Sequence, residues 1–127
     1  MFKNTIFMAA LLGLTLSGCA TPPAMPAVTA ETAKGKTLID AKGMTLYSFD
    51  KDSAGKSVCN GKCAENWPPL AAASTEALGE WSVVTRDDGS KQWALRGKPL
   101  YTFIKDTKPG DAVGDGFMNN AWHIARP

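Results

Sequence analysis

The chain carries the decapeptide GMTLYSFDKD at residues 43–52 and a second version of it, GKPLYTFIKD, at residues 97–106. The two copies are identical at six of their ten positions, and both contain the pattern Tyr-x-Phe-x-x-Asp. A tryptophan follows each copy at nearly the same distance, Trp67 in the first half and Trp122 in the second. Chance similarity rarely preserves both a motif and a trailing tryptophan, so the pattern indicates that one unit has been duplicated.

Both copies of the motif have the character of a β-strand. The stretch Leu-Tyr-x-Phe combines aromatic residues with period-two alternation, which favours strands. In the second half, residues 81–85 and 91–95 are further strand candidates, and Asp88-Gly89 between them predicts a hairpin turn because glycine accepts a positive φ. With a third strand at residues 99–104, this half predicts a three-stranded meander.

The first half predicts a related arrangement. Leu38-Ile39 is expected to form a hairpin arm that turns at residues 41–43 into the strand at residues 44–49. Either unit alone would leave an apolar face exposed, so we expect the two units to pack on each other. The predicted fold is mainly β with little helix, one small domain of two hairpin or meander repeats at about residues 36–70 and 81–126.

The N-terminal segment has the features of an export signal. Lys3 provides a positive charge, and the apolar run at residues 6–16 is too short to span a bilayer, which requires about 20 residues. The run ends in Leu16-Ser17-Gly18-Cys19, which resembles the lipobox of bacterial lipoproteins. This resemblance implies that residues 1–18 are removed as a signal peptide and that Cys19 receives the lipid.

A lipid on Cys19 would determine where the protein resides. Two or more acyl chains hold a protein stably at a membrane, so the membrane is the first expected partner. Ala20 follows the cysteine, whereas an aspartate there favours retention at the inner membrane. We therefore expect a lipid-anchored protein of the bacterial cell envelope, at the outer membrane and facing the periplasm rather than at the inner membrane.

Composition limits the class of protein. The chain has 127 residues, 44% hydrophobic and 20% charged, with a formal net charge of +2. These values fit one globular domain and do not fit a strongly basic nucleic-acid-binding protein, so no nucleic-acid partner is expected. Residues 19–33 are rich in Pro, Ala and Thr, and we expect them to be the lipidated cysteine and an extended tether. The β domain would then occupy residues 34–127.

Two cysteines, Cys59 and Cys63, remain after lipidation of Cys19. In an oxidising compartment an even pair is expected to form a disulfide, and Asn60-Gly61 supplies the turn. The alternative is a copper or redox site, because two thiolates and an imidazole suit Cu(I). Its further ligand would be His123 or Met118. Met118 lies four residues before Trp122, just as Cys63 lies four residues before Trp67. No cofactor is expected on the disulfide interpretation.

The lipobox and the two Tyr-x-Phe-x-x-Asp copies together resemble one known family. It is the secreted-repeat family of predicted lipoproteins with the motif Yx(F/W/Y)xxD. The motif residues that carry the resemblance are Tyr47, Phe49 and Asp52 in one copy and Tyr101, Phe103 and Asp106 in the other. Blocks around Cys59–Leu70, Asp88–Trp93 and Lys108–Gly116 extend the resemblance over residues 36–126. The resemblance implies no determined activity, and some relatives are loosely associated with the use of alkanes.

The sequence therefore predicts an envelope-anchored binding or interaction module, not an enzyme. No catalytic residues are assigned, because the sequence contains one histidine and no recognisable nucleophile with its base. The ligand would be a small molecule or another envelope protein, recognised by the loops at residues 50–67 and 106–122. The alternatives are the copper or redox protein and an accessory to apolar-substrate use.

Overall fold

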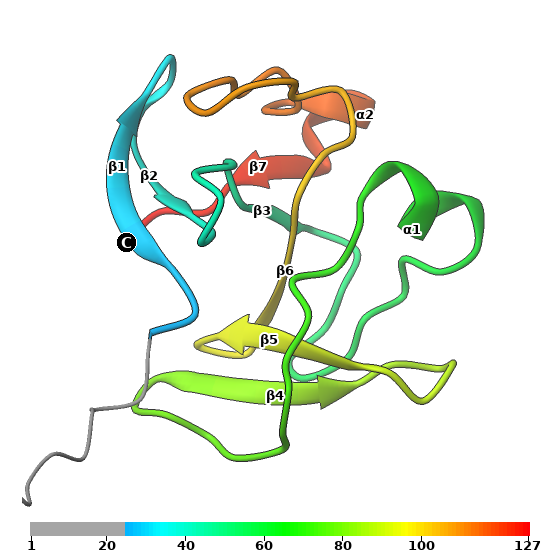
Figure 1. Ribbon diagram of the computed structural model, residues 1–127. Helices are drawn as coiled ribbons and strands as arrows, with labels where there is room; N and C mark the ends of the chain where they lie inside the picture. Colours follow the sequence, from blue (N-terminus) through cyan, green and yellow to red (C-terminus); the bar gives the residue numbers. More distant parts are fainter. Residues whose placement is uncertain (1–24) are drawn as a thin grey trace, which may run out of the picture.

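The computed structural model describes residues 25–127, which fold around short antiparallel strands (Figure 1). The elements in chain order are β1 (Val28–Thr32), β2 (Gly35–Ile39), β3 (Tyr47–Phe49), α1 (Lys62–Asn66), β4 (Trp81–Thr85), β5 (Lys91–Leu95), β6 (Lys98–Tyr101), α2 (Phe117–Asn120) and β7 (Trp122–Ile124). Both helices are short, so the prediction of a mainly β fold with little helix is confirmed. Within residues 25–127, no helix has the length and apolar character needed to cross a membrane. The signal segment, Cys19 and Ala20 lie outside the described residues.

The strands form two sheets. The larger has the order β4-β5-β6-β3-β7, and every neighbouring pair in it is antiparallel. The predicted meander is present as β4-β5-β6, and β1 and β2 form a separate hairpin. At the centre of the larger sheet, β3 pairs with β6 so that Tyr47 lies opposite Tyr101. The two copies of the motif are therefore direct neighbours in antiparallel orientation.

The folded part begins earlier than the sequence predicted. The tether was expected to extend to residue 33, but β1 pairs with β2 along its whole length, from Val28↔Ile39 to Thr32↔Gly35. Ala27, just before β1, is buried. The strand escaped prediction because it is held by backbone hydrogen bonds and exposes most of its side chains, so it shows no apolar alternation. The prediction is corrected to a folded region that starts near Ala27.

Each repeat contributes its last segment to the other repeat. The backbone of Leu70, which follows the first tryptophan, donates from its N–H to the carbonyl of Leu100 at 2.9 Å, and Ala125 donates in the same way to Leu46 at 2.8 Å. In the second repeat this segment is β7, which pairs with β3 of the first. Each unit therefore depends on the last segment of the other unit to complete its backbone hydrogen bonding.

A stack of four aromatic rings forms the centre of the main core. Its order is Phe103, Trp67, Trp122 and Phe49, so the rings come alternately from the second and the first repeat. Successive ring centroids are 3.9, 3.8 and 4.2 Å apart, and the planes differ by 12°, 3° and 12°. Tyr47 packs edge-on against this stack. The shared stack explains why both the phenylalanine of the motif and the distant tryptophan recur in each copy.

Candidate functional site

The tyrosines and aspartates of the motif are hydrogen-bonded across the repeats. Tyr47 of the first copy donates its hydroxyl to Asp106 Oδ2 of the second at 2.7 Å. Tyr101 of the second copy donates to Asp52 Oδ2 of the first at 2.6 Å. Each carboxylate therefore ties its own copy to the opposite one.

The second oxygen of each carboxylate holds the loop that follows it. Asp52 Oδ1 accepts the backbone N–H of Val58 at 2.8 Å, and Asp106 Oδ1 accepts that of Val113 at 2.9 Å. Burial is the largest influence on both carboxyls and raises the pKa of Asp52 and Asp106, while the hydrogen bonds from the tyrosines act in the opposite direction. The motif therefore builds two equivalent structural joints.

A buried arginine extends one of these joints and makes the two halves unequal. Arg86, in the turn after β4, is 4% exposed. Its guanidinium donates to Ser57 Oγ at 2.9 Å and to Gln92 Oε1 at 2.7 Å, and it also donates to the Cys59 carbonyl. Ser57 Oγ in turn lies 2.6 Å from the Tyr101 hydroxyl. The positive charge of Arg86 lowers the pKa of Asp52 and so offsets part of the effect of burial.

Sequence reasoning missed Arg86. An arginine beside an Asp-rich turn is ordinarily a solvated surface residue, and nothing in its spacing distinguishes this one. Its burial follows from the loop at residues 57–60, which closes over it and supplies several acceptors. Only the position of that loop relative to β4 and β5 creates the site.

The disulfide between Cys59 and Cys63 is present, as predicted. Cys59 is fully buried in the main core, and Cys63 packs against the same cluster. The corresponding position to Cys59 in the second repeat is Gly114, where a Cβ atom would come within 2.7 Å of Trp67 and 2.8 Å of Phe103. The bridge therefore belongs to one repeat alone, because the second loop packs too closely on the aromatic stack to accept a side chain there.

The candidate copper ligands do not form one site, because Cys59 and Cys63 are joined in the disulfide and His123 lies on another side of the sheet. Trp122 and Ile124 of β7 are buried in the cluster that contains Cys59, so His123 between them faces the opposite side of the sheet. There His123 Nε2 lies 2.8 Å from Asp50 Oδ2. Within residues 25–127, no cluster of three or more His, Cys, Asp or Glu side chains has the geometry of a metal site.

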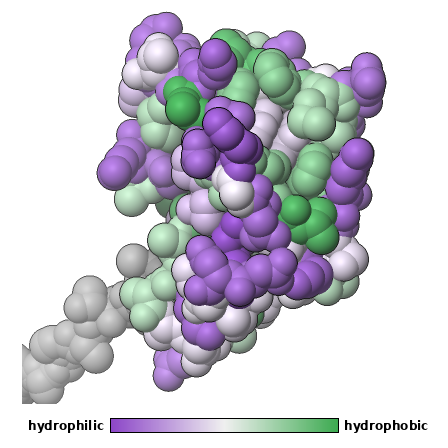
Figure 2. Space-filling model, turned by 90° about the vertical axis from the view of Figure 1, so that its right-hand side faces the viewer, coloured by the Kyte–Doolittle hydropathy of each residue, from purple (hydrophilic) through white to green (hydrophobic). Residues whose placement is uncertain are grey.

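The side chain of Met118 is exposed on α2. Val113 and Phe117 in the same region are exposed as well. Figure 2 looks at the side of the molecule that carries α1 and α2, and it shows apolar residues distributed among hydrophilic ones. Apolar side chains spread in this way are common on soluble proteins and do not by themselves mark a site.

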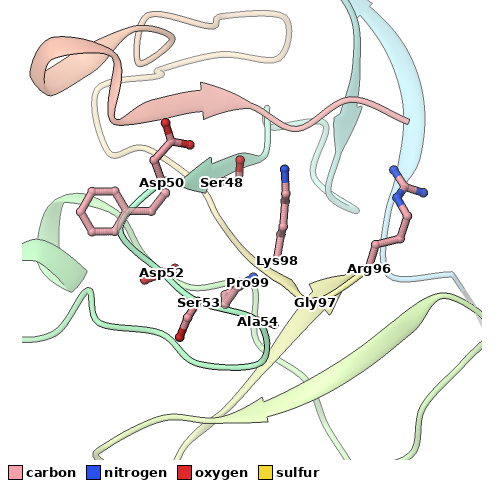
Figure 3. A pocket seen from close by; sticks show the side chains of 10 residues that line it. Ser48, Asp50, Asp52, Ser53, Ala54, Arg96, Gly97, Lys98 and Pro99 are labelled. Carbon is pink, nitrogen blue, oxygen red and sulfur yellow. The ribbon is translucent and has the colours of Figure 1, made fainter.

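A concave region runs along β3, β6 and β7 of the large sheet. Two adjoining hollows of about 370 and 320 Å³ share the lining residues Ser48, Asp50, Arg96 and Lys98. We call their union the sheet groove. In β3 the core residues Tyr47 and Phe49 alternate with Ser48, which directs Ser48 to the groove. Figure 3 shows the side chains of Ser48, Lys98 and Arg96 extending in a similar direction, upward in this view.

Strand register brings the groove residues together. Ser48 lies opposite Leu100 of β6 on one side and opposite His123 of β7 on the other. Lys98 is two residues from Leu100 along β6 and therefore shares its face. His123 and Arg126 line the hollow of about 320 Å³. The groove thus collects side chains from three strands that are far apart in the sequence.

The groove lies where the two repeats differ. At the positions equivalent to Asp50, Lys98 and His123, the other copy has Ile104, Met44 and Pro68. The tyrosine and phenylalanine of the motif and the trailing tryptophan, by contrast, recur in both copies and lie in the main core. Because the shared residues build the frame, the residues that are particular to one copy are the better candidates for a specific function.

The fold and the groove define a class: a small β protein made of two interlocked repeats with one asymmetric concave surface. The sequence profile of a family described as a secreted repeat of unknown function matches residues 28–71 and, a second time, residues 82–126. The chain belongs to this family, and the two matches cover both structural repeats. No curated protein and no solved structure matches the chain.

Proposed function

We propose that this protein is a lipid-anchored module of the bacterial envelope that binds a small molecule in the sheet groove without transforming it. The observation that carries the proposal is the groove itself, whose two hollows have volumes of about 370 and 320 Å³. Ligand sites are concave, have volumes of this order, and combine an apolar lining with a few polar groups. The description of the family as secreted agrees with an envelope location.

Binding fits the groove better than catalysis does. Ser48, Asp50 and His123 lie on the same side of the sheet, a combination that would suit nucleophilic chemistry if the serine and histidine were joined. His123 instead directs Nε2 to Asp50, and within residues 25–127 no hydrogen bond links it to Ser48. A serine nucleophile needs such a base within hydrogen-bond reach. The groove therefore offers polar recognition groups on a rigid sheet.

Removal of the proposed lipid site should abolish membrane attachment. In cells supplied with labelled palmitate, the wild-type chain is expected to incorporate the label and to fractionate with the outer membrane. Cys19→Ala should lose the label and leave the membrane fraction, because no acyl chain remains to hold it. Ala20→Asp is the matched control, which should keep the label but shift to the inner membrane. Label retained by Cys19→Ala would contradict the anchor.

Ligand binding in the groove is tested with the full chain in lipid nanodiscs. Methyl groups of Leu95 and Leu100 report on the groove, and that of Ile104 reports on a surface outside it. Members of a diverse fragment library are expected to shift the leucine methyl resonances in a saturable manner. Ser48→Trp should remove these shifts by filling the groove, whereas Ser82→Trp, on β4, should not. A library with no member that perturbs the leucine methyls would reject the groove as a ligand site.

A further inference from the structure

The smaller hollow of the groove combines an aliphatic floor with a cationic rim. Leu95, Leu100 and Ala125 line it, and all three belong to the second buried cluster, which packs on this face of the sheet. Strand register explains the floor, because Leu95 lies opposite Lys98 and Leu100 lies opposite Ser48. An apolar floor recruits the hydrophobic part of a ligand and also strengthens any electrostatic contact made beside it, since it lowers the local dielectric constant.

Three basic side chains surround this floor, those of Arg96, Lys98 and Arg126. Arg126 is held in place because its guanidinium donates to the carbonyls of Lys36 and Lys34 at 2.8 and 3.2 Å, neutral partners that leave its charge unbalanced. Lys98 forms no salt bridge with any described carboxylate. Arg96 is the exception, since it pairs with Glu80 at 3.0 Å. Two of the three cations are therefore available to a ligand.

The negative charge within this hollow is already engaged. Asp50 is the only acidic residue that lines it, and its Oδ2 lies 2.8 Å from His123 Nε2. With Arg96 counted as neutral because Glu80 pairs with it, Lys98 and Arg126 give +2 and Asp50 gives −1, a formal sum of +1 with neutral His123. A surface of this charge attracts anions and repels cations. The aliphatic floor beside it favours an anion that carries an apolar body.

Resting on the proposed function, we propose that the ligand is a small organic anion whose carboxylate or phosphate group contacts Lys98 and Arg126 and whose aliphatic body lies on Leu95, Leu100 and Ala125. Arg126 offers the planar donor geometry that carboxylates and phosphates accept, while Lys98 acts as a point charge. Arg96, with Glu80 beside it, forms the outer rim. The hollow of about 320 Å³ limits the ligand to a compact molecule.

Matched probes separate charge from shape. Cyclohexanecarboxylate and cyclohexyl phosphate are the anionic probes, cyclohexanecarboxamide is the neutral one and cyclohexylmethylammonium is the cationic one. Acetate and inorganic phosphate supply the anionic groups without the ring. The full chain in nanodiscs is titrated with each probe, and the methyl resonances of Leu95 and Leu100 are followed. At least one ring anion is expected to bind ten times or more tightly than the amide, the ammonium compound, acetate and inorganic phosphate.

The two ring anions also show which anionic group the site recognises. Tighter binding of one of them identifies that group as a carboxylate or as a phosphate. Lys98→Gln should weaken binding of the preferred anion about tenfold, and higher salt should weaken it further. Lys91→Gln, on the same sheet but outside the groove, is the matched control and should leave the affinity unchanged. Equal or tighter binding of the amide or the ammonium compound would overturn the proposal. If library fragments bind in the groove and no ring anion does, this inference fails while the proposed function stands.

Discussion

Replacing Trp122 with alanine is expected to lower the free energy of unfolding by about 3–5 kcal/mol. Trp122 is fully buried at the middle of the four-ring stack, with Trp67 at 3.8 Å on one side and Phe49 at 4.2 Å on the other. Its removal leaves a cavity between rings of both repeats, and it also takes away the edge-on contact with Tyr101. The loss is a large part of the ~5–15 kcal/mol that stabilises a typical domain.

Urea unfolding followed by far-ultraviolet circular dichroism measures this loss. Trp122→Phe keeps a ring in the stack and gives up no hydrogen bond, because Trp122 Nε1 has no partner among the described residues. It is expected to cost less than half as much as alanine and to keep the protein folded for measurement. Trp93→Ala is the matched control, since Trp93 is only partly buried and packs against the second cluster. An equal cost at Trp93 and Trp122 would refute the central role of the stack.

The repeat explains why the fold could be predicted. It also explains why the sequence could not show that each copy of the motif bonds to the other copy. Identical motifs in Tyr47–Asp52 and Tyr101–Asp106 predict two similar units, and the structure contains them. The sequence does not say whether Tyr47 bonds Asp52 of its own copy or Asp106 of the other, because the two aspartates are chemically equivalent. Geometry decides: antiparallel pairing of Tyr47 with Tyr101 directs each hydroxyl toward the opposite copy.

The groove was less accessible to prediction than the core. Cys59 and Cys63 could be paired because they are near each other in sequence and the compartment favours a bridge. Ser48, Lys98 and His123 come from three strands, so their proximity depends on the register of β3 with β6 and with β7. His123 was singled out only as a candidate metal ligand. Its actual partner, Asp50, is 73 residues away.

Symmetry in the core and asymmetry in the groove have different physical origins. The stack and the Tyr–Asp joints need the same residue types in both copies, because each copy completes the other. A side chain that faces the outside of the sheet carries no such constraint. Asp50 and its counterpart Ile104 illustrate this, since the frame around them is similar while their charge and polarity differ. A duplicated frame can thus hold one specific site without losing its core.

Replacing Arg86 with methionine is expected to lower the free energy of unfolding by about 2–4 kcal/mol at neutral pH. Methionine fills a similar space, but Gln92 Oε1 and the Cys59 carbonyl then lose the donor that satisfies them, and Ser57 loses a partner. Arg96→Met is the matched control. Arg96 is exposed and makes one salt bridge to Glu80, so its replacement should cost less than about 0.5 kcal/mol.

The cost of Arg86→Met should also depend on pH, with a sign set by Asp52. Burial raises the pKa of Asp52 above its ordinary value of 3.8 and Arg86 lowers it, so removal of Arg86 raises this pKa further in the folded state. The folded variant then binds more protons than the unfolded chain above pH 3.8, and its stability falls as pH rises through that window. The deficit relative to wild type should therefore be smaller near pH 4 than near pH 7.

Urea unfolding of both proteins over this pH range measures the difference. In the Asp52→Asn background the pH-dependent part should vanish, because the titrating carboxyl is gone, while the part caused by the unsatisfied acceptors should remain. A deficit that stays constant from pH 4 to pH 7 in the single variant would show that the charge of Arg86 does not act on Asp52. The asymmetric joint would then be held by hydrogen bonds alone, without the charge balance between Arg86 and Asp52 that the structure indicates.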